Sequence, residues 1–172
     1  MTAKTRGYGE APTTLRWLLV LVVLLATTAG CGDDHPMEPS LSLAEAQQAA
    51  ANQIREAAAG TFPPGFTLEE LPPQPLNCTD SSGKPTGQVL LGVTFWVNDL
   101  PGTDNNAYFG ALKAWWAGHG WTLSTDSRPE DMFINATRDG YLMSLRANVN
   151  QRLAIGNSTP CVWRNRTPGT SS

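Results

Sequence analysis

The chain has 172 residues, of which 41% are apolar and 16% are charged, and its formal net charge at pH 7 is −3. This length and composition suit one folded domain with a modest core. An acidic chain without a basic patch excludes nucleic acid as a partner and disfavours binding to anionic lipid headgroups.

The first thirty residues have the pattern of an export signal. Lys4, Arg6 and Arg16 form a basic start, and an apolar run covers residues 17–26. Ten apolar residues rise only ~15 Å as a helix, about half a bilayer core, so this run is too short to span a membrane. Residues 1–30 are therefore predicted to be a signal peptide. Its removal takes away three basic residues and one acidic residue, which leaves 9 basic and 14 acidic residues and a net charge of −5.

Small residues and a cysteine follow the apolar run, in the order Thr28, Ala29, Gly30, Cys31. This segment resembles the lipobox of bacterial lipoproteins. The resemblance implies that a diacylglyceryl group alkylates the thiol of Cys31, and that cleavage makes Cys31 the N-terminus. At about 0.8 kcal/mol per buried CH₂, two acyl chains would hold the protein on the extracytoplasmic side of the cell membrane. The alternative is an ordinary secretory leader that leaves Cys31 as a free thiol.

The rest of the chain divides into three parts by composition. Residues 31–40 are polar and contain proline, which predicts a tether. Residues 41–163 are predicted to form a single α+β domain. Residues 164–172 have the same polar character as the tether, and they are predicted to be a flexible tail.

Two cysteines remain after Cys31, namely Cys78 and Cys161. An even pair in an exported chain predicts a disulfide, because the compartment outside the membrane does not keep thiols reduced. A metal site would need further ligands near these cysteines, and none stands at suitable spacing. No metal and no other cofactor is expected.

Two helices are predicted. Ser42 and Glu45 match a capping box, and a narrow apolar stripe predicts a helix over residues 43–59 with Gly60 in the left-handed position after its end. A second helix is predicted over residues 104–117, because its large apolar residues fall within an arc of about 120°. These residues are Tyr108, Phe109, Leu112, Trp115 and Trp116.

The strands alternate with turn signals. Residues 61–87 contain six prolines and are predicted to be a long irregular connection. The alternating apolar residues of 88–97 predict a strand, and shorter strands follow at 121–125, 132–137, 141–147 and 152–156. The order predicts an α+β two-layer sandwich, with two helices packed on one face of a mainly antiparallel sheet of four to five strands.

Such a sandwich leaves one sheet face open. Leu90 and Trp96 lie on the less apolar side of the strand at 88–97, and with Leu142 they form the candidate binding patch. Indole faces stack on sugar rings and on apolar side chains. The alternative is that segment 61–87 covers this face.

No catalytic residue is predicted, because the sequence lacks the common nucleophile, metal-binding and phosphate-binding motifs. His119 is the only histidine of the predicted domain, and it is expected to hydrogen-bond the last carbonyls of the second helix. Asp126, Glu130 and Asp131 lie in a predicted hairpin loop, where such residues serve turn formation and solubility.

The whole chain resembles small actinobacterial cell-surface lipoproteins of uncharacterised function. The signal peptide and Cys31 carry the specific part of this resemblance, and it implies no catalytic residues. The first hypothesis is a non-enzymatic binding or accessory module that contacts an envelope protein or a cell-wall ligand. The alternatives are a structural surface protein without a ligand and a cell-wall hydrolase.

The predicted anchor can be tested directly. Mass spectrometry of the mature protein is expected to find Cys31 as an acylated N-terminal residue, because the lipobox pattern precedes it. An unmodified sulfur at Cys31, together with mature protein free in the culture medium, would contradict the anchor.

Overall fold

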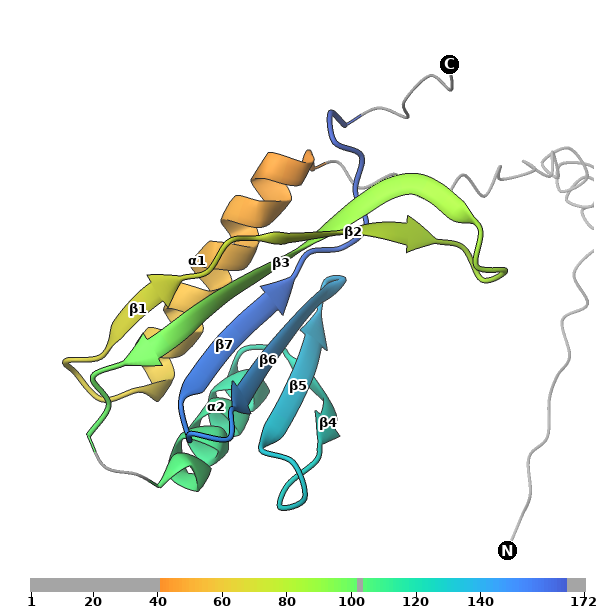
Figure 1. Cartoon of the computed structure of the whole chain (residues 1–172). Helices are drawn as coiled ribbons and strands as arrows, with labels where there is room; N and C mark the ends of the chain where they lie inside the picture. The colour runs from red at the N-terminus through yellow and green to blue at the C-terminus, as the bar shows by residue number, and fades with distance from the viewer. Residues whose placement is uncertain (1–40, 102–103, 167–172) are drawn as a thin grey trace, which may run out of the picture. The chain divides into compact units, whose positions relative to one another are not determined.

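The computed structural model describes residues 41–101 and 104–166, which form two helices and seven strands (Figure 1). The predicted signal peptide, Cys31 and the tether lie outside the described residues. The elements are, in chain order, α1 (Leu43–Thr61), β1 (Thr67–Glu70), β2 (Gln74–Thr79), β3 (Pro85–Asn98), α2 (Asn105–Gly118), β4 (Thr122–Asp126), β5 (Phe133–Arg138), β6 (Tyr141–Ala147) and β7 (Leu153–Ser158).

All strand pairs are antiparallel and belong to one sheet with the order β1-β3-β7-β6-β5-β4, and β2 also pairs with β3. The α+β class and the antiparallel meander of the last four strands are confirmed. The predicted number of four to five strands is wrong, because the sheet has seven.

Both additional strands come from segment 61–87, which was expected to be irregular. The side chains of β1 and β2 are almost all exposed, so neither strand has the apolar alternation that marks a half-buried strand. They form because their backbone groups hydrogen-bond to β3, which is 14 residues long and starts as early as Pro85. The segment therefore widens the sheet, because β1 and β2 pair along the outer edge of β3.

Helix α1 begins with the predicted capping box. The Ser42 backbone amide donates to the Glu45 carboxylate over 2.8 Å, and the Glu45 amide donates to the Ser42 hydroxyl. The predicted end at Gly60 is wrong, because Gly60 is helical and Phe62 follows the helix as its C-cap. Gly60 is needed for packing instead, since a Cβ at this position would lie 2.4 Å from Cδ1 of Trp115.

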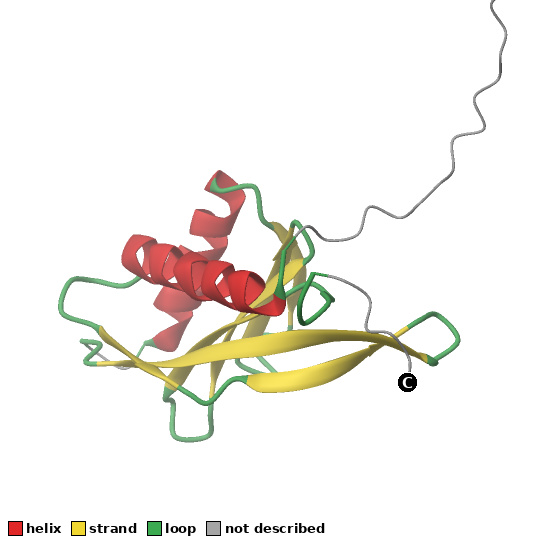
Figure 2. Ribbon diagram, turned by 90° about the horizontal axis from the view of Figure 1, so that it is seen from above, coloured by secondary structure: helices red, strands yellow, loops and turns green. Residues whose placement is uncertain are grey.

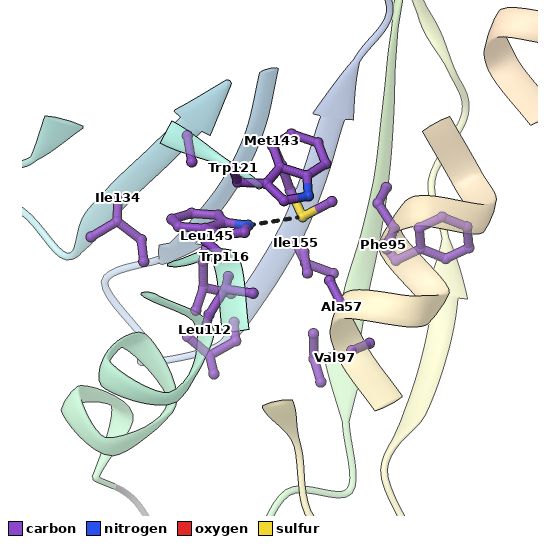
Figure 3. Packing of buried hydrophobic residues seen from close by; sticks show 14 of the residues in the cluster. Ala57, Phe95, Val97, Leu112, Trp116, Trp121, Ile134, Met143, Leu145 and Ile155 are labelled. Atoms are coloured by element: carbon purple, nitrogen blue, oxygen red, sulfur yellow. Dashed lines mark hydrogen bonds between the residues drawn. The ribbon is translucent and has the colours of Figure 1, made fainter. Parts of the chain in front are cut away.

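Both helices lie on the same side of the sheet (Figure 2). The buried side of α1 consists of small residues and Ile54, which allows a close approach to β3 and β7. Trp116 of α2 is 1% exposed, and its Nε1 donates to Met143 Sδ of β6 over 3.3 Å (Figure 3). Burial of these apolar side chains on one face of the sheet is the main source of stability.

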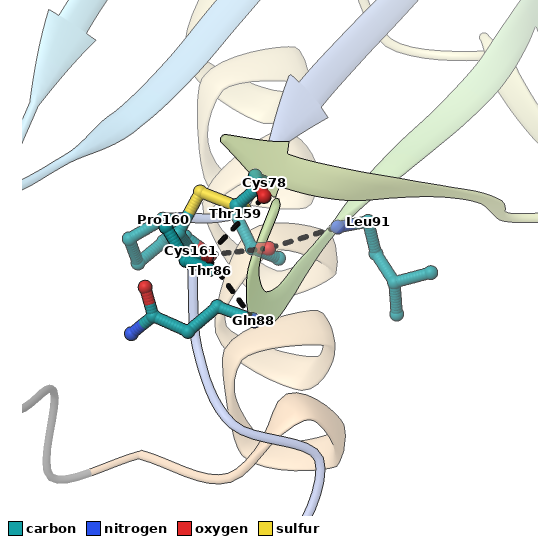
Figure 4. The surroundings of a disulfide bond; sticks show 7 residues. All are labelled: Cys78, Thr86, Gln88, Leu91, Thr159, Pro160 and Cys161. Carbon is teal, nitrogen blue, oxygen red and sulfur yellow. Dashed lines mark hydrogen bonds between the residues drawn. A yellow bond between two sulfur atoms is a disulfide. The ribbon is translucent and has the colours of Figure 1, made fainter. Parts of the chain in front are cut away.

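The predicted disulfide is confirmed, since Cys78 of β2 is bonded to Cys161 beyond β7 (Figure 4). Backbone hydrogen bonds join the same two regions, because Val89 and Val162 exchange amide–carbonyl bonds of 3.0 Å. The Leu91 amide also donates to Oγ1 of Thr159 over 3.0 Å. The C-terminal segment is thereby fixed along the start of β3.

Removal of the disulfide is expected to destabilise the domain strongly. The bond closes a loop between residues 83 apart in sequence, and loss of such a constraint on the unfolded chain costs about 4 kcal/mol. Urea unfolding of the double variant Cys78→Ser/Cys161→Ser measures this loss. The wild-type protein under reducing conditions serves as the control and should unfold at the same urea concentration as the variant. Equal stability of the variant and the oxidised protein would contradict the expectation.

Candidate functional site

The side chains of β3 alternate between the core and the opposite sheet face. Phe95 and Val97 are 3% and 4% exposed and pack beneath the helices. Thr94 and Trp96 point to the other face, on which neither helix packs. We call this second side of the sheet the open face. The predicted alternation of this strand is confirmed.

The strand register places five side chains in one row across the open face. Going from β1 to β5, the row contains Glu69, Trp96, Ala154, Arg146 and Phe133. Neighbouring strands lie ~4.8 Å apart, so Trp96 and Phe133 are separated by about 14 Å. The small side chain of Ala154 leaves the surface low between the two aromatic rings.

The next row on the open face consists of short side chains. Thr94, Gly156, Ser144 and Asn135 are aligned in register. A Cβ at Gly156 would lie 3.2 Å from Oγ1 of Thr94 and 3.4 Å from Oγ of Ser144, so glycine permits the two hydroxyl groups to approach over it. The row that contains Trp96 and Phe133 therefore lies beside a lower row of short, mostly polar side chains.

A hollow of about 340 Å³ opens at this end of the face. Its lining includes Trp96, Phe133, Arg146, Asp131 and Val149, and we call it the Trp96 hollow. Val149, in the turn between β6 and β7, is 96% exposed. The hollow thus combines two aromatic rings, an apolar side chain and two side chains of opposite charge.

Neighbouring polar groups hold the indole of Trp96 in place. The guanidinium of Arg152 lies 4.4 Å from the centre of the Trp96 ring. The same guanidinium donates to Glu69 Oε2 over 2.8 Å and to Asn98 Oδ1 over 3.1 Å. An exposed ion pair of this kind contributes little free energy, but it orders the arginine on the ring.

A second hollow of about 500 Å³ lies near the end of β3, and its lining includes Asn98, Asp99, Asn105 and Gln151. Asn105 is 8% exposed, and its amide donates to the backbone carbonyl of Gln151 over 2.9 Å. The Asp99 carboxylate accepts from the Thr67 hydroxyl. Because several of its polar groups bind one another, this hollow is the weaker candidate.

The structure places all three residues of the predicted patch on the open face, but it does not bring them together. Trp96 is six residues from Leu90 along β3, which corresponds to ~20 Å. Leu90 pairs with Leu76 of β2, and Leu142 lies in a neighbouring row. The patch is therefore two sites, an apolar one at the disulfide end and the Trp96 hollow at the other.

The histidine has the structural role that was predicted. His119 is the C-cap of α2, and its Nδ1 donates to the Trp115 carbonyl over 2.7 Å. Its ring is stacked on the indole of Trp115 at 4.1 Å. His119 lines neither hollow.

The carboxylates of the predicted hairpin loop have different surroundings in the structure. The side chains of Arg128 and Lys113 both donate to Asp126 Oδ2 over 2.7 Å. These hydrogen bonds, the one from Arg128 most strongly, hold the pKa of Asp126 well below its usual 3.8. This cluster connects the β4–β5 turn to α2. Asp131 takes no part in it and lines the Trp96 hollow.

Comparisons with protein-family models, curated proteins and solved structures give no match to this chain. Within residues 41–101 and 104–166, no group of three or more His, Cys, Asp or Glu side chains is arranged to hold a metal ion. Neither α1 nor α2 has the length and apolarity needed to cross a membrane.

The two faces of β3 are expected to respond differently to truncation. Phe95→Ala should lower the free energy of unfolding by about 3–5 kcal/mol, since it leaves a cavity in the core. Trp96→Ala should cost only about 1–2 kcal/mol, because it removes a half-buried ring and its arginine contact. Chemical denaturation of both variants measures the two free energies of unfolding. If Trp96→Ala lowered this free energy as much as Phe95→Ala, the result would contradict an open face.

Proposed function

We propose that this chain is a lipid-anchored extracytoplasmic protein and a non-catalytic binding module of the cell envelope. The observation that carries the binding role is the one-sided sheet with the Trp96 hollow. The basic, apolar and small-residue pattern that ends at Cys31 supports the anchor. The membrane is then one partner, and an envelope protein or cell-wall ligand is the second.

The position of the hollow suits such a protein. The twelve residues from Cys31 to Ser42 can span at most ~40 Å, so the domain stays close to the outer leaflet. The chain enters the domain where α1 begins, and the β6–β7 turn that lines the hollow lies at the opposite end of the domain (Figure 1). An anchored domain could therefore present the hollow to material beyond the membrane.

The composition of the hollow also favours binding. Trp96 and Phe133 supply aromatic surface, while Arg146 and Asp131 supply polar groups that fix the orientation of a ligand. Binding sites commonly combine a concave apolar surface with a small number of convergent polar groups. The hydrolase is the less favoured alternative, because His119 serves as a helix cap and the carboxylate of Asp126 is bound by Arg128 and Lys113.

Site-specific crosslinking in living cells tests this function. Three variants each carry the photoreactive residue p-benzoylphenylalanine, at Val149 in the hollow, at Leu142 at the other end of the open face, or at Glu56 on the exposed side of α1. Ultraviolet light is expected to yield an adduct with envelope material from the Val149 variant. Val149 is 96% exposed, so its replacement should leave the fold intact.

Glu56 provides the matched control, because it is exposed but belongs to the helical layer. Equal adduct formation at Glu56 and Val149 would mean unspecific proximity, and it would overturn the proposal. So would the absence of any adduct at both Val149 and Leu142. An adduct at Leu142 alone would move the binding surface to the disulfide end of the open face.

A further inference from the structure

The charges that line the Trp96 hollow balance one another. Arg146 and Asp131 are exposed, and neither makes an ion pair or a side-chain hydrogen bond with another of the described residues. The nearby charge of Arg152 is matched by Glu69 at 2.8 Å. A ligand with a net negative or positive charge would thus meet one attractive and one repulsive group.

The free polar groups are complementary in their hydrogen bonding. The guanidinium of Arg146 has only donors, and the ionised carboxylate of Asp131 has only acceptors. A hydroxyl group both donates and accepts, so adjacent hydroxyl groups of one ligand can satisfy both side chains without carrying charge. An apolar ligand would leave both of these groups without partners, which is costly when water is displaced.

The aromatic residues define the length of the ligand. Trp96 and Phe133 lie about 14 Å apart in their row, with Ala154 and Arg146 between them. This span exceeds a single sugar ring. The apolar faces of successive rings in a chain could contact the two aromatic residues at once.

We propose that the Trp96 hollow binds an uncharged oligosaccharide. Trp96 and Phe133 contact sugar faces, while Arg146 and Asp131 bind hydroxyl groups. This inference rests on the proposed function, since it assigns a ligand class to the same binding face. It goes further because it names the ligand class and makes ligands with a net charge the weaker binders.

Isothermal titration calorimetry on the mature full-length protein in detergent micelles tests the ligand class. The uncharged probes are cellotetraose, chitotetraose and mannotetraose. The charged probes are the anionic tetragalacturonate and the cationic glucosamine tetramer. At least one uncharged probe is expected to bind about tenfold or more tightly than every charged probe. Stronger binding of a charged probe, or no binding of any uncharged probe, would overturn the inference.

Variants locate the binding site. Trp96→Ala and Phe133→Ala are each expected to weaken the binding of the best uncharged probe about tenfold. Leu142→Ala is the matched control at the other end of the open face and should bind like the wild type. Thermal unfolding verifies that each variant is folded, and Phe133→Ala keeps the test valid should Trp96→Ala unfold. Unchanged affinity in a folded Phe133→Ala variant would contradict the site.

The crosslinking experiment separates this inference from the proposed function. An adduct at Val149 that digestion and mass spectrometry identify as protein would retain a binding module and overturn the oligosaccharide. A glycan adduct at the same position would support both. The absence of adducts would count against the binding module itself.

Discussion

The alternation of side chains along β3 is the constraint on which the rest of this structure depends. The strand has 14 residues, pairs with β1 and β2 on one edge and with β7 on the other, and has one side toward the helices and one on the open face. Its inward residues, such as Phe95, complete the core, while Trp96 points to the open face. A slip of one residue in this register would exchange the two faces, so the same pairing fixes both stability and the candidate site.

The two ends of the domain differ in how strongly they are cross-linked. The disulfide, the Val89–Val162 bridge and the contacts of Arg166 hold the C-terminal segment beside β3 and the start of α1. Hydrogen bonds from Arg166, the stronger effect, and from Ser42 lower the pKa of Glu45 to about 2, so this carboxylate is ionised at neutral pH. At the opposite end, the side chains of Arg146 and Asp131 line the Trp96 hollow. Covalent and polar links thus secure the end at which the chain enters, and the opposite end carries the proposed binding site.

The candidate site could be predicted only in part from the sequence. Trp96 could be assigned to the open face because the alternation of β3 is strong and local. Phe133, Arg146 and Asp131 come from the meander, and they approach Trp96 only because β7 lies between β3 and β6. That strand order depends on pairing between distant segments, which no local pattern encodes. The outward position of Phe133 in a strand was the one available signal for it.

The sequence by itself determined the elements whose signals are local. These are the capped start of α1, the apolar arc of α2, the turn at Asp139-Gly140, and the Cys78–Cys161 disulfide, which was predicted from an even pair of cysteines after the predicted signal peptide. Only the tertiary structure decided that β1 and β2 form, that α1 continues through Gly60, and that the predicted patch separates into two sites. Each of these depends on a partner from elsewhere in the chain. The edge of β3 supplies hydrogen bonds to the exposed strands, and Trp115 occupies the space that a glycine leaves open.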